Sequence, residues 1–221
     1  MTPPPRYERG TSPLEWGGTL TVADLSVRRG GRRVIDRLSF TLGAGELLLL
    51  TGRNGSGKTT LLRALALLVP RSGGEIRWQG ANVAADRDAW HGRLAWLGHH
   101  DGLKGDLTLI ENLLLAERLR AGEPVHSNLD AALAAFDLVP LADRPARSLS
   151  AGQRRRGALA RVVASGAAIW LLDEPLNALD APAREALRTV IAAQIQRGGL
   201  VVAATHAPLD IARARGLELA A

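Results

Sequence analysis

The sequence contains no cysteine, and only two of its 28 basic residues are lysines, Lys58 and Lys104. The lack of cysteine excludes a disulfide framework, a thiolate metal site and covalent haem attachment through a CxxCH motif. Its strongly apolar runs, such as LLLL at residues 47–50, fall far short of the roughly 18 residues that span a bilayer. These absences favour a soluble protein of a reducing compartment.

The first 17 residues are rich in proline and lack the apolar segment of a secretory signal. We therefore expect a disordered tail over residues 1–17 and a single domain over residues 18–221, since 221 residues suffice to bury a substantial core.

Positive charge predominates, with a formal net charge of +6 and an isoelectric point near 11.0. A basic protein can bind nucleic acid or an anionic membrane. Here, however, the arginines are scattered, and only residues 28–33 and 154–156 are densely basic. We interpret the charge as a bias of composition, and we expect no nucleic acid partner.

The order of apolar segments indicates an α/β protein. Residues 19–27 and 34–42 alternate in polarity around Gly30 and Gly31, which predicts an antiparallel hairpin. A buried strand is predicted at 46–51, a helix from Lys58 that ends at Pro70 and Gly73-Gly74, and a strand at 75–80. Residues 108–164 are helical in pattern, with capping pairs at Thr108/Glu111 and Ser127/Asp130. Continuous apolar runs at 168–174 and 200–206, separated by a helix at 181–199, predict buried parallel strands.

Residues 52–60, GRNGSGKTT, match the pattern G-x-x-x-x-G-K-[ST] between a predicted strand and a predicted helix. Glycines let backbone N–H groups surround a phosphate, and the helix N-terminus adds positive potential. In this pattern Lys58 reaches the β- and γ-phosphates and Thr59 ligates Mg²⁺. The segment predicts a nucleoside triphosphate site, and its candidate ligands are Gly52, Arg53, Asn54, Gly55, Ser56, Gly57, Lys58, Thr59 and Thr60.

The apolar run at 168–174 ends in two acids, Asp173 and Glu174. A carboxylate at the end of such a strand, beside a P-loop, holds the magnesium ion, and we assign Asp173 to it. Glu174 is then placed to act as a general base toward the attacking water.

The segment LSAGQ resembles the LSGGQ signature of the ATP-binding cassette (ABC) ATPases, with Ala151 in place of a glycine. Ser150 is also a predicted helix N-cap. The resemblance extends, in the family's order, to a D-loop ending at Asp180 and to a switch histidine, His206. It covers about residues 18–210, and it implies that the signature binds the ATP held by a second copy of the chain. The signature residues are Leu149, Ser150, Ala151, Gly152 and Gln153.

The resemblance implies an α/β P-loop NTPase of ABC type. Its expected parts are an antiparallel β subdomain, a RecA-like parallel-sheet core and a helical subdomain at about residues 103–164. It also implies an ATP hydrolase with Glu174, His206 and Lys58 as catalytic residues and Mg²⁺ as cofactor. The expected partners are a second ATPase subunit and integral membrane permease subunits, at the cytoplasmic face of the inner membrane.

Two places depart from the ABC pattern. Where an aromatic residue normally stacks on adenine, this chain has Arg28 and Arg29; a guanidinium can also stack on a base, so Arg29 is the candidate. At the glutamine of the Q-loop, counting places His100, and neutral histidine can accept one hydrogen bond and donate another. A metal site at His99, His100 and Asp101 is disfavoured, because neighbouring side chains of an extended loop are expected to point apart.

The stretch LGHHDGLKGDLTLIENL most resembles the haem exporter family of cytochrome c biogenesis, as do LSAGQRRRGALAR and EIRWQG. This resemblance implies an ATPase subunit that powers the export or release step of haem delivery. Two alternatives remain: an ABC ATPase that serves another exported cargo, and a soluble ABC ATPase that acts in assembly or on nucleic acid.

Overall fold

The computed structural model describes residues 17–121, 129–207, 209–211 and 214–219. The expected tail, up to residue 16, and the candidate cap Ser127 lie outside the described residues.

The first sheet is antiparallel, with the strand order β2-β1-β4-β5. Its strands are β1 (Leu20–Arg29), β2 (Arg32–Leu42), β4 (Gly73–Trp78) and β5 (Ala81–Asn82). The predicted hairpin is confirmed: β1 pairs with β2, and Gly30 and Gly31 both have positive φ, at 54° and 77°. Such a two-glycine turn matches the twist of the strands it connects.

The second sheet is parallel throughout, with the strand order β6-β7-β8-β3-β9. Its strands are β3 (Leu47–Thr51), β6 (Leu94–Leu97), β7 (Ile169–Asp173), β8 (Leu200–Ala204) and β9 (Ala214–Glu218). Both faces of this sheet are covered, because Ile169 and Leu171 of β7 belong to one apolar core while Trp170 and Leu172 belong to another. The continuous apolar runs of the sequence are explained by this double burial.

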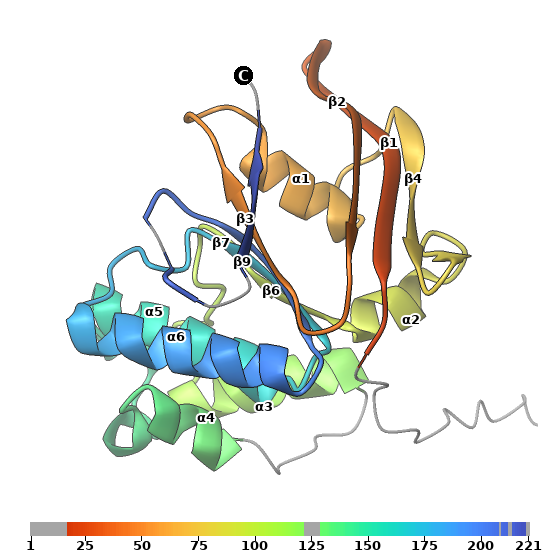
Figure 1. The fold of residues 1–221 in the computed structure, drawn as a ribbon. Coiled ribbons are helices and arrows are strands. Elements are labelled where there is room, and N and C mark those ends of the chain that lie inside the picture. The colour runs from red at the N-terminus through yellow and green to blue at the C-terminus, as the bar shows by residue number, and fades with distance from the viewer. Residues whose placement is uncertain (1–16, 122–128, 208, 212–213, 220–221) are drawn as a thin grey trace, which may run out of the picture.

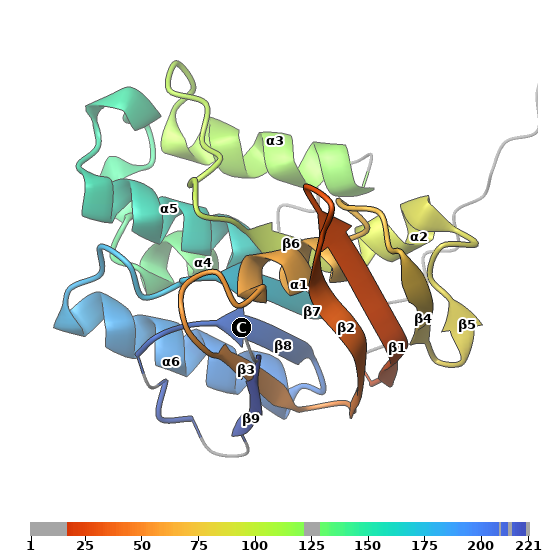
Figure 2. The same ribbon diagram turned by 90° about the horizontal axis from the view of Figure 1, so that it is seen from above.

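Helix α1 (Lys58–Leu65) lies between the two sheets, and its leucines share a core with the antiparallel strands (Figure 1). The opposite face of the parallel sheet is covered by the later helices, which lie below the sheet in Figure 1 and extend to one side of it in the view from above in Figure 2. These helices are α3 (Leu109–Ala121), α4 (Leu129–Ala135), α5 (Ala151–Ala164) and α6 (Ala181–Gln196). Within the described parts of the chain, none of the helices combines the length and the apolar character that a membrane span requires.

Most of the predicted elements are present, with local differences. The capping box at Thr108 and Glu111 is confirmed, since each side chain accepts the other residue's backbone N–H. The first helix ends earlier than expected, at Leu65. Two residues later, Leu67 has a positive φ of 56°, which is not helical. Gly73 and Gly74 therefore begin β4 instead of ending the helix. The sequence reasoning did not anticipate β5, β9, the short helix α2 (Arg87–Gly92) or the 3₁₀ turns η2 (Val139–Leu141) and η3 (Ala146–Ser148).

Candidate functional site

Four neighbouring strands of the parallel sheet carry the candidate residues at their carboxyl ends. In spatial order, β6 leads to His99, β7 to Asp173 and Glu174, β8 to His206, and β3 to the P-loop at residues 52–60. In open α/β sheets, ligands bind at this edge. The strand order thus brings together segments that are up to about 150 residues apart in sequence.

The P-loop wraps around the ammonium group of Lys58. The Nζ atom of Lys58 donates to the carbonyl of Gly52 at 2.8 Å and to that of Arg53 at 3.2 Å, and the side chain is buried. Gly57 precedes α1 with φ at 102° and provides no side-chain cap, so the first N–H groups of the helix have no capping side chain. That arrangement suits an anion at the helix N-terminus.

Space and hydrogen-bonding capacity in the P-loop fit a phosphate. A Cβ at Gly52 would come within 2.5 Å of the Leu219 carbonyl and 2.8 Å of the Ser56 hydroxyl, so only glycine fits there. The Ser56 Oγ atom is buried, and it has no hydrogen-bond partner among the described residues. A buried polar atom without a partner is costly unless a ligand satisfies it.

The two candidate magnesium ligands lie together. The Thr59 hydroxyl donates to the Asp173 carboxylate at 3.1 Å, although 114 positions separate the two residues. Hydroxyl and carboxylate oxygens are ligands that Mg²⁺ accepts, and Mg²⁺ usually keeps water and substrate oxygens for its other positions. Among the described residues there is no group of three or more His, Cys, Asp and Glu side chains that could hold a metal by themselves. The pair therefore fits a magnesium ion bound jointly with a phosphate.

Glu174 and His206 face each other across the site. The Glu174 Oε1 and His206 Nε2 atoms are 3.3 Å apart, with the glutamate side chain 20% exposed and the histidine 50% exposed. Glu174 takes a left-handed backbone with φ at 47°, which a non-glycine residue adopts only when its surroundings hold it there. The carboxylate is thus accessible to a small molecule yet fixed by a strained turn.

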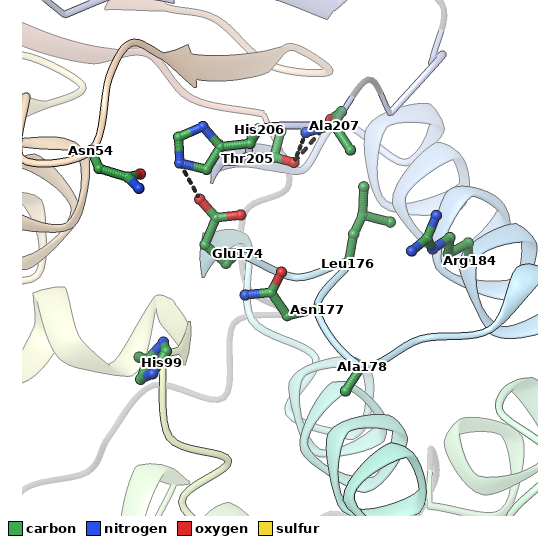
Figure 3. Close-up of a pocket in the computed structure, with 10 residues that line it drawn as sticks. All are labelled: Asn54, His99, Glu174, Leu176, Asn177, Ala178, Arg184, Thr205, His206 and Ala207. Carbon is green, nitrogen blue, oxygen red and sulfur yellow. Dashed lines mark hydrogen bonds and ion pairs between the residues drawn. The ribbon is translucent and has the colours of Figure 1, made fainter.

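A pocket of about 480 Å³ opens in front of this pair. Figure 3 shows Asn54 of the P-loop, Glu174 and His206 pointing toward the same space, with His99 on another side. The remaining lining comes from the segments after β7 and β8. It consists of Leu176, Asn177, Ala178, Arg184, Thr205 and Ala207.

Between the two adjacent histidines, it is His99 that lines the pocket. Counting along the sequence gave this place to His100; both side chains are exposed, but His100 is absent from the lining. The expectation that the two side chains point apart was wrong, because their rings lie 5.5 Å apart in an edge-to-face arrangement.

The signature segment begins α5, and the predicted N-cap at Ser150 is confirmed. The Ser150 hydroxyl accepts from the backbone N–H of Gln153, and the Gln153 side chain accepts from that of Ser150. Gly152 lies against the backbone of Ala178, whose carbonyl a Cβ would approach to 3.2 Å. Asp180 caps α6 by accepting from the Ala183 N–H at 3.0 Å. None of Leu149, Ser150, Ala151, Gly152 and Gln153 lines the pocket beside the P-loop.

Of the three arginines at 154–156, the middle one is buried and its two neighbours are half-buried. Arg154 and Arg156 donate to carbonyls of nearby segments, those of Leu149 and Phe136. Arg155 is buried and contacts the ends of both β6 and β7. The sequence alone identifies these residues only as a basic cluster, since nothing in the local pattern indicates which charged side chain is buried.

A second arginine of α5, which is half-buried, holds the segment after β6. Arg161 Nη2 donates to the Asp101 carbonyl at 3.2 Å. Burial lowers the pKa of Arg161 from its usual value, and the nearby Asp101 carboxylate opposes this shift.

At the hairpin, Arg28 donates to the Gly31 carbonyl at 2.9 Å, while Arg29 is exposed.

Comparison with known proteins gives consistent matches. The family model of the ABC transporters matches residues 35–177. The cytochrome c biogenesis ATP-binding export protein CcmA of Gluconobacter oxydans is 48% identical over 204 residues, which are 92% of this chain and 88% of that protein. The protein of the same name from Rhodospirillum rubrum is 46% identical over 196 residues, covering 89% of this chain and 83% of the relative.

Among solved structures, the ATP-binding subunit of an ABC transporter superposes with a TM-score of 0.77 at 25% identity, covering 85% of this chain and 79% of that one. The match to the family model spans more than half of the sequence, and the named relatives match nearly all of it. The chain therefore belongs to the ABC transporter family, among the ATP-binding export proteins of the CcmA type.

Proposed function

We propose that this chain is the ATP-hydrolysing subunit of a membrane exporter that serves haem delivery in cytochrome c biogenesis. The observation that carries the assignment to cytochrome c biogenesis is the identity of 48% to a protein of that name across 92% of the chain. The ATPase activity itself is supported by the family and by the geometry of the pocket, in which a P-loop faces a carboxylate and a histidine.

The P-loop residues, the end of β7 and His206 each have a part in the proposed hydrolysis. The Lys58 ammonium leaves the carbonyls of Gly52 and Arg53 to contact the β- and γ-phosphates, while P-loop N–H groups hold the phosphate chain. Thr59 and Asp173 would hold the magnesium ion, which neutralises charge on the phosphates when it is bound. Glu174 accepts the proton of the attacking water, and His206, 3.3 Å from it, keeps the carboxylate oriented and contacts the γ-phosphate.

The signature residues act on a second nucleotide. Because Ser150 and its neighbours lie outside the pocket of their own chain, they are available to the ATP of a second copy. Two chains then enclose two ATP molecules head to tail, and closure of this homodimer drives the permease subunits in the membrane. The subunit is peripheral, at the cytoplasmic face of the inner membrane.

His99 serves as the Q-loop side chain. It lines the pocket, whereas His100 is outside the lining, so we transfer to His99 the part that counting gave to His100. A histidine can both accept and donate a hydrogen bond, as the amide of glutamine does. A hydrogen bond between His99 and the bound nucleotide can thus change the position of the segment that leads into α3.

Complementation tests the biological assignment. A bacterium that lacks its own CcmA is given the full-length chain or its Glu174→Gln variant, and covalent haem on c-type cytochromes is measured. We expect the wild-type chain to restore haem attachment and the variant to fail. If the wild-type chain hydrolysed ATP and co-purified with a different permease but did not restore haem attachment, the result would instead support another cargo. Recovery of nucleic acid and of no membrane protein would support the soluble alternative.

A further inference from the structure

The guanidinium of Arg155 joins three parts of the molecule. It belongs to α5, it is 4% exposed, and its two terminal nitrogens reach the ends of two different strands. Nη2 donates to the carbonyls of Asp173 and Glu174 at 2.9 and 2.5 Å. Nη1 donates to the carbonyl of Gly98 at 3.0 Å and lies 3.3 Å from the Asp101 carboxylate. These contacts cross the boundary between the helical segment and the parallel sheet.

The backbone that Arg155 holds is the one that carries Glu174. The carbonyls of Asp173 and Glu174 flank a residue with φ at 47°, and the Glu174 carbonyl also accepts from the Asn177 N–H at 3.2 Å. A left-handed conformation of a glutamate persists only when its surroundings favour it. Charge-assisted donors to the two carbonyls on either side of the strained angle provide such a constraint.

The other terminal nitrogen of Arg155, Nη1, holds the segment that carries His99. Gly98 and Asp101 bracket His99, and both contact Arg155 Nη1. The planar guanidinium therefore sets the position of Glu174 relative to His99 across the pocket. A lysine at this position could not reproduce the arrangement, because its donors radiate from a single nitrogen.

We propose that Arg155 is a positioning residue for hydrolysis: it holds the turn of Glu174, and with it the loop of His99, in the geometry that directs the carboxylate at the attacking water. This role rests on the proposed function, in which Glu174 is the general base. Arg155 does not line the pocket, so it acts through Glu174 and does not contact the nucleotide.

The test uses the purified full-length chain with MgATP and four variants: Arg155→Lys, Glu174→Gln, the double variant, and Arg156→Lys as a matched control. Arg156 is on the same helix but donates to the Phe136 carbonyl, away from the strand ends. We expect Arg155→Lys to lower kcat by about 10²-fold, the effect typical of an ångström-scale displacement of a reacting group. We expect its MgATP dissociation constant to stay within about twofold and Arg156→Lys to keep its kcat.

The double variant separates positioning from a general structural role. If Arg155 acts through Glu174, then Arg155→Lys lowers the residual single-turnover rate of Glu174→Gln no further. A loss of the same size in both backgrounds, an equal loss in nucleotide affinity, or an unchanged kcat in Arg155→Lys would each overturn the proposal. Full activity of Glu174→Gln alone would refute the general base, and with it this role for Arg155.

Amide hydrogen exchange provides a readout that does not depend on hydrolysis. In Arg155→Lys, the N–H of Asn177, which bonds to the Glu174 carbonyl, is expected to exchange faster than in the wild type. If the Asn177 N–H exchanged at the wild-type rate in Arg155→Lys, Arg155 would not hold the Glu174 turn. This result would contradict the proposal even in a preparation with no measurable ATPase activity.

Discussion

The two halves of the pocket are built in different ways. The P-loop half comes from nine consecutive residues, and the Lys58 ammonium donates to carbonyls of the same loop, those of Gly52 and Arg53. The opposite half brings Glu174, His206 and His99 from the ends of three strands, and Arg155, outside the pocket, holds the Glu174 turn from a helix that lies between His99 and Glu174 in sequence. The first half is local, whereas the second exists only once the sheet and α5 have packed.

This difference suggests a division of labour between binding and hydrolysis. The donors of the P-loop are backbone groups and one lysine, so we expect phosphate binding to depend largely on local structure. Hydrolysis needs side chains positioned relative to one another across the sheet edge, and such precision depends on tertiary contacts. Substitutions in the two halves should therefore affect different quantities.

The largest effect is expected in the hydrolytic half. Glu174→Gln removes the proposed general base while it retains the size of the side chain, so kcat should fall by about 10²- to 10⁴-fold. The dissociation constant for MgATP should stay nearly unchanged, because Thr59 and Asp173 are retained. Single-turnover hydrolysis and equilibrium binding of ATP measure the two quantities. A variant with wild-type turnover would remove Glu174 from the mechanism.

The binding half should respond in the opposite way. Lys58→Ala removes a charge-assisted donor to phosphate, and it should weaken ATP binding by about 10- to 150-fold, which corresponds to a loss of about 1.5–3 kcal/mol. The control is Lys104→Ala, which changes the only other lysine, an exposed one. Calorimetric titration with ATP distinguishes the two variants. Equal affinity of the Lys58 and Lys104 variants would contradict the division between the halves.

A smaller effect is expected at His206. His206→Ala leaves the Glu174 carboxylate without its neighbour at 3.3 Å, and we expect kcat to fall by about tenfold, within the range for loss of one charged hydrogen bond. ATP affinity should change less than kcat. A steady-state series over ATP concentration separates the two parameters, and an effect confined to KM would assign His206 to the binding half instead.

The smallest effect distinguishes the two adjacent histidines. His99→Ala should lower ATP turnover by about three- to tenfold, the cost of one hydrogen bond, while His100→Ala should leave it nearly unchanged. His99→Gln, which restores an amide of similar bonding capacity, should recover most of the activity. The reverse pattern, with His100 as the sensitive position, would return the Q-loop assignment to the residue that counting selected.

Patterns local to the chain determined much of the architecture. The hairpin around Gly30-Gly31, the buried strands at β3, β7 and β8, the capping box at Thr108 and the N-cap at Ser150 were all predicted, because each depends on neighbours a few residues away. The short edge strand β9 was not, since its pattern, ARGLE, has one partly buried residue and four exposed ones. Its pairing with β3 depends on the sheet and not on its own hydrophobicity.

The sequence by itself thus determined the P-loop pattern and the acidic end of β7, and it predicted that the two lie together. Only the tertiary structure decided which of two adjacent histidines faces the pocket, and that the arginine in the middle of a basic run is buried against the Glu174 turn. Both outcomes depend on side-chain directions set by packing between β6, β7 and α5. A linear pattern specifies which residues follow one another, but distances between strands far apart in the chain are fixed by the folded core.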